Sequence, residues 1–428
     1  MEFWGGTWYP PDVSLKIGRG AKVRRLKRSL QVVGPDLGKR ALILYAFTLP
    51  LGKTLSAVIA LVAAAALLRE DLKSVLRRAF NDEIFRVLAL LLFLYILGLL
   101  WSHDLISGLK MCKKAALLSG VYLLCFLHLR DSSSRERVLL AFVGGVTVLD
   151  LIALMKFLGV FGEGAFQLPC KALMNHIWFG NLSALSFYLA LLLAMRRPLL
   201  RALLWGGGLI ALVAVLLSTS RGVWLALLIV LILWSLLFRG RQRTLAIVVL
   251  SCLAMGGLLG HSLIGKRVEQ ARNEVRAFMR GERLASSVGD RLAMWYTSWQ
   301  IFLDHPFIGA GTGDYEEEVF RKTEELGSFR YIRHYNQPHN IYLHALVMHG
   351  LVGLGVLLGV FALLLKRAWV GFRSPETWSF GAMGISAIVH TMVAGFTEGV
   401  LRIHVLVSAL GLILGCCLVY NETKRKDV

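Results

Sequence analysis

The sequence predicts an all-α polytopic membrane protein, and three observations lead to this fold class. Hydrophobic residues make up 56% of the 428 residues, charged residues only 18%, and the mean hydropathy is +0.62. The apolar runs at 88–101 and 222–238 approach the roughly 20 residues with which a helix crosses a bilayer. Lys and Arg cluster in short connections between such runs, which is the pattern of cytoplasmic loops.

The formal charge of +21 fits this class and does not indicate nucleic-acid binding, because the basic residues form no continuous face or arm. The clusters that orient the helices lie at 23–28, 196–198, 239–243, 366–369 and 423–426. The basic start of the chain lacks the apolar core and cleavage site of a signal peptide. We therefore expect a cytoplasmic tail that touches anionic lipid.

About twelve spans are expected along the chain. They lie near 40–50, 53–68, 84–101, 110–129, 136–158, 175–195, 199–217, 220–238, 244–260, 341–365, 377–397 and 403–420. The turn from Pro50 to Lys53 separates the first two spans. With this count both termini, and every basic cluster named above, fall in the cytoplasm. A single helix over 40–68 would instead reverse the N-terminus.

One long polar segment interrupts this pattern on the predicted periplasmic side. The expected domains are the N-terminal tail (1–39), transmembrane helices one to nine (40–260), a large periplasmic loop (261–340), transmembrane helices ten to twelve (341–420) and a C-terminal tail (421–428). A connection this long is usually functional.

The loop is expected to contain helices of its own. Residues 266–283 predict an amphipathic helix with Val275 on its apolar face. Residues 291–306 predict an aromatic-rich helix that ends at Pro306, and the GAGTG segment at 309–313 is expected to be flexible. The acidic run at 316–320 is interpreted as a solvated helix face.

Polar residues gather at the predicted outer ends of the spans, and ionisable groups at this depth usually serve a function. They are Lys53, Asn175, His176, Arg221, Arg291, Gln337, His339, Asn340, Glu398, Arg402 and His404. Four further histidines, His305, His334, His344 and His349, are interpreted as structural. Cys112 and Cys170 lie near connections on the same side, so a disulfide between them stays open.

The two arginines and His339 each allow two interpretations. Arg221 follows the tight turn 218–220, where its guanidinium either contacts lipid phosphate or serves as a forked donor for a pyrophosphate. Arg291 suits the same role or a surface ion pair with Asp290. His339 either stabilises a helix start or accepts a hydroxyl proton. In the second case Asn340 or Gln337 is expected to orient its ring.

These residues suggest a reaction that needs neither metal nor nucleotide. The sequence shows no metal-ligand spacing and no nucleotide-binding loop, so we expect no cofactor. A reaction outside the cytoplasm must receive its activated bond with the substrate. A lipid diphosphate ester meets this requirement, because arginines stabilise the departing anion and a histidine deprotonates the attacking hydroxyl.

Three motifs together resemble the O-antigen ligase and polymerase superfamily. They are TSRGVWLALLI (219–229), RLAMWYTSWQIFLDHPFIGAGTGDY (291–315) and QPHNIYLHALVMHGLVG (337–353). Each is loose alone, but their order, spacing and flanking spans are specific, and the resemblance extends over the predicted spans. It implies a GT-C-like bundle of about twelve helices with one large periplasmic loop.

The resemblance also implies an activity and a site. A metal-independent glycosyltransferase would take a glycan from undecaprenyl diphosphate on the periplasmic face of a Gram-negative inner membrane. By position, His339 matches the family's catalytic histidine, and Arg221 and Arg291 match arginines assigned to the pyrophosphate. Further candidates rest on position alone: Lys53, His176, Arg402 and His404.

Several activities fit this class. A single dominant outer loop favours an O-antigen ligase, which transfers the finished glycan to lipid A-core; the alternatives are an O-antigen polymerase and a protein O-oligosaccharyltransferase. We predict direct displacement with inversion, because no Asp or Glu nucleophile for a double displacement is apparent apart from Glu398, the only carboxylate placed for that role. A transporter or flippase would carry midplane charges and repeat symmetry. The sequence has only Lys156 and Asp150 near the midplane and no visible repeat.

Overall fold

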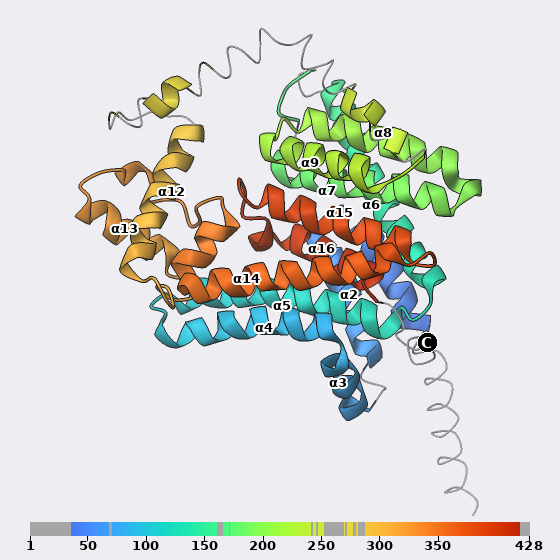
Figure 1. The fold of residues 1–428 in the computed structure, drawn as a ribbon, viewed down its shortest axis with the longest axis horizontal. Coiled ribbons are helices and arrows are strands. Elements are labelled where there is room, and N and C mark those ends of the chain that lie inside the picture. Colours follow the sequence, from blue (N-terminus) through green and yellow to red (C-terminus); the bar gives the residue numbers. More distant parts are fainter. Residues whose placement is uncertain are drawn as a thin grey trace, which may run out of the picture.

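Long helices form one bundle, and a smaller helical unit made of α12 and α13 extends beyond one end of it (Figure 1). The computed structural model describes residues 36–67, 71–160, 166–170, 172–240, 243–244, 247–251, 269, 272–276, 280 and 287–419. No β-strand occurs among these residues, so the all-α class is confirmed.

The helices follow in chain order after a first helix at 36–48. They are α2 (Lys53–Leu67), α3 (Leu72–Asn81), α4 (Glu83–Leu97), α5 (Leu105–His128), α6 (Ser132–Phe157), α7 (His176–Arg196), α8 (Arg201–Leu217), α9 (Arg221–Leu237), α12 (Ser287–Asp304), α13 (Tyr315–Glu325), α14 (Ile341–Arg373), α15 (Trp378–Ala394) and α16 (His404–Cys417). Short 3-10 turns are η1 (Gly98–Trp101), η2 (Pro198–Leu200), η3 (Arg330–Ile332) and η4 (Val400–Arg402).

Helix length and composition make this a membrane protein. Within the described ranges, 6 helices are long and apolar enough to cross a bilayer, and four shorter apolar helices accompany them. A turn separates helix 36–48 from α2, as expected from the sequence after Pro50. The predicted span at 244–260 lies largely outside the described residues. The twelve-span count, the domain boundaries and the orientation stay predictions.

Local sequence explains where four of the helices begin. Asp71, Asp82, Asp104 and Asp131 precede α3, α4, α5 and α6, and each carboxylate accepts a hydrogen bond from a backbone N–H three residues later. Such caps satisfy amides that have no partner inside the helix. The helix α3 between two apolar helices was not expected from the sequence.

Helix α7 is the centre of the bundle. Of its most apolar 18-residue window, 89% is buried, compared with 33% for α4 and α8. It packs against α6, α8, α9 and α15. Because α7 begins at His176, this packing fixes the position of His176, one of the candidate site residues named above.

The glycine-rich segment at 309–313, expected from the sequence to be flexible, forms backbone hydrogen bonds with α14. Helix α14 is broken at Gly350, which has φ 62° and ψ −153°. Its broken turn leaves backbone groups free to bond elsewhere. The N–H of Ala310 donates to Val347 O (2.8 Å), and the N–H of Leu351 donates to Pro306 O (2.8 Å). The loop therefore completes the hydrogen bonding of the kinked helix.

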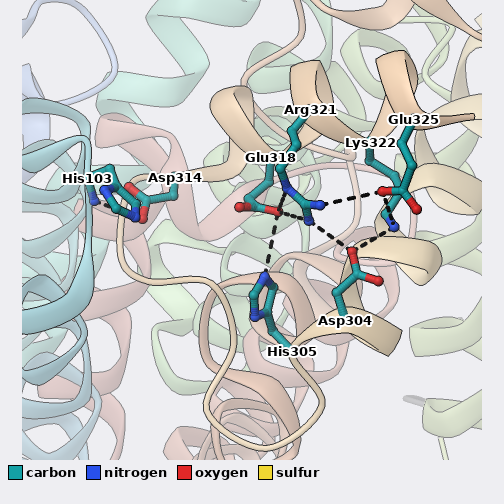
Figure 2. A network of polar contacts seen from close by, with 8 residues as sticks. All are labelled: His103, Asp304, His305, Asp314, Glu318, Arg321, Lys322 and Glu325. Atoms are coloured by element: carbon teal, nitrogen blue, oxygen red, sulfur yellow. Dashed lines mark hydrogen bonds and ion pairs between the residues drawn. The ribbon is translucent and has the colours of Figure 1, made fainter.

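Ion pairs hold α12 against α13 (Figure 2). Arg321 pairs with Glu318 (2.7 Å) and with Asp304 (2.9 Å), which also pairs with Lys322 (2.7 Å). At the bundle end, Asp314 accepts hydrogen bonds from the backbone N–H groups of His103 and Asp104. The α12–α13 unit is thus attached to the start of α5.

Two other expectations concern the loop and the cysteines. The helix expected at 266–283 lies mostly outside the described residues; Val275, placed on its apolar face, is 44% exposed. The disulfide left open between Cys112 and Cys170 does not form, since both thiols are free and buried. Cys170 Sγ instead donates to the carbonyl oxygen of Ala153 (3.1 Å).

Candidate functional site

The turn between α8 and α9 presents Arg221. Thr219 adopts φ 51°, and Trp224 Nε1 donates to Val215 O (2.9 Å), which ties the start of α9 to the end of α8. Gly222 allows a close approach to the α15–α16 connection, because a Cβ there would lie 2.0 Å from Thr397 Oγ1. The exposed Arg221 side chain therefore begins a helix next to Thr397.

His339, just before α14, contacts Glu398, and two further hydrogen bonds hold its partner and its neighbour Pro338. Its Nδ1 lies 2.9 Å from Glu398 Oε1. The N–H of Gly399 also donates to this oxygen (3.1 Å), and Trp295 Nε1 donates to Pro338 O (3.0 Å). With an ionised Glu398 accepting from Nδ1–H, a neutral ring keeps its lone pair on Nε2.

The backbone of His339 is strained, with φ 51°. Residues other than glycine rarely adopt this conformation, and it persists only where surrounding contacts impose it. The side chain is 24% exposed, whereas that of Glu398 is 6% exposed. The site thus buries the carboxylate and leaves the imidazole accessible.

The expectation that Asn340 or Gln337 orients the His339 ring was wrong. Asn340 Oδ1 accepts from the backbone N–H groups of Tyr342 and Leu343 and so caps α14. Gln337 packs against Gly399, and its Oε1 is buried without a hydrogen-bond partner. Glu398, 59 residues away along the chain, orients the ring instead.

A cavity of about 250 Å³ joins residues from four separate segments. Its polar walls include His176 and Asn181 of α7, Arg221 at the start of α9, Arg291 of α12, and Thr397 and Glu398 after α15. Asn181 Oδ1 lies 3.0 Å from His390 Nε2. The helix packing therefore brings both predicted pyrophosphate arginines, His176 and the partner of His339 to one space.

Arg291 faces this cavity and forms no ion pair with Asp290 in the described structure. Asp290 accepts from the Tyr335 hydroxyl instead (2.9 Å). Burial lowers the pKa of the Arg291 guanidinium, Glu398 raises it and Arg221 lowers it. Arginine still remains charged near neutral pH. Two cations and one carboxylate consequently share a partly dehydrated site.

His339 itself is not among the residues that line the cavity, and neither are Lys53, Arg402 and His404. Arg402 donates to the carbonyl oxygen of Asn336 and lies 3.2 Å from His344 Nε2, so His344 is engaged beside the site. Lys53 lies over the Trp178 ring, 5.7 Å from its centroid. His404 interacts electrostatically with Lys53.

Sequence reasoning missed the partner of His339 and several supporting side chains. Glu398 was recognised only as a possible nucleophile. Trp295 and Tyr335, which contact the His339 segment, carried no separate signal. A Thr-Glu-Gly sequence between two apolar spans was the available signal, because an acidic group at this depth requires a partner.

The described residues form an all-helical membrane protein. In it, a histidine hydrogen-bonded to a carboxylate lies beside a cavity that two arginines line. Residues 206–358 match the family described as O-Antigen ligase. Over this segment the chain is similar to O-antigen ligases. The matched residues contain Arg221, Arg291 and His339 and end before Glu398.

One curated protein is distantly similar to this chain. An uncharacterized protein of Haemophilus influenzae is 21% identical over 230 residues, which cover 51% of this chain. The same residues cover 56% of the relative, so the chain spans about half the length of the curated protein that it matches.

Proposed function

We propose that the protein is an O-antigen ligase of the bacterial inner membrane. It transfers O-antigen polysaccharide from undecaprenyl diphosphate to a sugar hydroxyl of lipid A-core on the periplasmic face. The observation that carries this proposal is the 2.9 Å contact between His339 Nδ1 and Glu398 Oε1. Glu398 lines the same cavity as Arg221 and Arg291.

The proposed reaction is a single displacement. The acceptor hydroxyl oxygen attacks the anomeric carbon of the donor and forms the new glycosidic bond. His339 Nε2 takes the hydroxyl proton, and Glu398 stabilises the imidazolium that results. The bond from the anomeric carbon to the diphosphate oxygen breaks, and its electron pair leaves with undecaprenyl diphosphate. This reaction inverts the anomeric configuration.

The arginines act on the leaving group. Undecaprenyl diphosphate gains negative charge as the glycosidic bond breaks, and Arg221 and Arg291 are cations on the walls of one cavity. Cations fixed before the reaction stabilise such charge without reorganisation. The contacts of Glu398 with His339 and with the Gly399 N–H favour a supporting role for it over that of a nucleophile.

The first test is a lipopolysaccharide gel from the native host after deletion of the gene. Bare core, with polymeric glycan accumulating on undecaprenyl diphosphate, is the result expected for a ligase. Core capped by a single repeat would contradict the proposal and indicate an O-antigen polymerase. An unchanged ladder would reject both activities and direct the search to another acceptor, such as a protein.

The second test separates an enzyme from a transporter. Purified protein in detergent, given undecaprenyl diphosphate-linked glycan and lipid A-core, is expected to form the joined product without metal or nucleotide. A chelator should leave this transfer unchanged. A flippase would form no covalent product, so absence of product from well-folded protein would contradict the proposed activity.

A further inference from the structure

One basic segment departs from the charge pattern of the predicted topology. The sequence KMCKK at 110–114 begins the fourth predicted span, on the side opposite the other basic clusters. Lysines are less frequent on this side of a membrane protein. Lys113 and Lys114 lie more than two turns into α5, where charged groups are costly and usually serve a function.

Helix packing places further basic groups near these lysines. Helix α5 packs against α16, η4 and α2. Lys114 interacts electrostatically with Lys113, Lys53 and Arg402. His404, at the start of α16, interacts with Lys53, Lys113 and Lys114. Three helices and a 3-10 turn therefore bring basic groups together from distant parts of the chain.

No carboxylate among the described residues pairs with Lys53, Lys113 or Lys114. Lys110 differs, because it interacts with Asp104 on the same helix. His404 Nδ1 is buried without a hydrogen-bond partner. Lys53 and Lys113 are exposed and Lys114 is half-buried. Neighbouring like charges repel each other, so an anion bound here would relieve this repulsion.

The cationic group is separate from the cavity but adjacent to it. None of its members lines the cavity that holds Arg221 and Arg291. Lys53 lies over the ring of Trp178, which follows the cavity residue Ile177. Arg402 binds the carbonyl oxygen of Asn336, three residues before His339. An anion held here would lie next to the segments that carry the cavity and His339.

We propose that Lys53, Lys113, Lys114 and His404 form a second anion site, which holds a phosphate group of the glycolipid acceptor. This proposal rests on the proposed function and adds to it a place for the acceptor, distinct from that of the donor diphosphate. Lysines suit this task because a flexible point charge binds phosphate without a fixed orientation. The acceptor hydroxyl is then brought to His339 from the side of α2 and α5.

Equilibrium binding tests the site without requiring transfer. Purified protein is titrated with lipid A-core, either intact or enzymatically dephosphorylated. The double variant Lys113→Gln/Lys114→Gln is expected to bind intact lipid A-core about tenfold more weakly, as the loss of charge-assisted contacts predicts. Its binding of dephosphorylated acceptor and of undecaprenyl diphosphate should equal that of the unaltered protein. Lys110→Gln, from the same basic segment, is the matched control.

Three results would overturn the proposal. One is equal binding of intact acceptor by the double variant and the unaltered protein. Another is weaker binding of undecaprenyl diphosphate by the double variant. The third is equal competition by phosphatidylglycerol, which would assign the lysines to bilayer headgroups. Failure of the proposed function is a separate outcome: the protein would bind acceptor through these lysines and form no product.

Discussion

Two cationic regions lie next to each other in this protein, and they differ in what accompanies the charges. The first has Arg221 and Arg291 on the walls of a 250 Å³ cavity, together with the carboxylate of Glu398. The second is the group around Lys113 and Lys114, for which the described residues supply no carboxylate partner. Only the first region adjoins a histidine, His339, whose Nδ1 is hydrogen-bonded to a carboxylate, that of Glu398. Charge alone suits binding, whereas chemistry requires a proton acceptor in a defined orientation.

The largest expected effect comes from removing the proposed base. His339→Ala should fold normally and lower the rate of transfer by about a thousandfold, within the range for a lost general base. The measurement is product formation by purified protein at saturating acceptor. The control is His305→Ala in the α12–α13 unit, which should keep normal transfer. Full activity of a well-folded His339→Ala protein would show that His339 is not the base. The two regions would then no longer differ in catalytic role.

Removing only the orienting carboxylate should have the next largest effect. Glu398→Gln keeps the size of the side chain but no longer stabilises the imidazolium, so transfer should fall about a hundredfold or more. The loss should lie in kcat, with the KM for donor nearly unchanged. Glu317→Gln, at an exposed position of α13, is the control. A large change in donor KM alone would instead assign Glu398 to substrate binding.

Removing the kink of α14 should lower the stability of the protein and disturb the first cationic region, without changing the second. At Gly350, where φ is +62°, a Cβ would lie 2.3 Å from the Phe307 carbonyl carbon. Gly350→Ala should therefore destabilise the protein by about 2 kcal/mol or more and disturb α12, which carries Arg291. Gly355→Ala in the same helix meets open space and should be neutral or slightly stabilising. Thermal unfolding in detergent measures both, and equal midpoints would contradict the role of the kink.

The smallest effect should come from exchanging the two kinds of cation. Arg221→Lys keeps the charge but replaces a planar fork by a point donor, so the KM for the donor should rise about tenfold. Lys113→Arg in the second region should leave acceptor binding within about twofold, because phosphate accepts either cation. Steady-state kinetics and acceptor titration measure the pair. The reverse outcome would mean that the assignments of donor and acceptor must be exchanged.

Much of the fold followed from local features of the sequence. Apolar runs predicted α4 to α9 and α14 to α16, because hydrophobic length is a property of each segment. The predicted bounds missed the start of α5 at Leu105 and the end of α14 at Arg373. Pro306 was correctly expected to follow the end of an aromatic-rich loop helix, which begins at Ser287 and not at Arg291. The amphipathic α3 was missed, since its 10 residues are too short and too polar for a span.

The sequence by itself determined the class of protein, the order of its motifs and the identity of the arginines and His339 as candidates. These depend on residue type and spacing along the chain. The tertiary structure alone decided that Glu398, and neither Asn340 nor Gln337, orients His339. It also decided that the glycines at 309–313 fix a kinked helix. Both outcomes depend on contacts between distant segments, and helix packing sets such contacts without leaving a periodic signal in either segment.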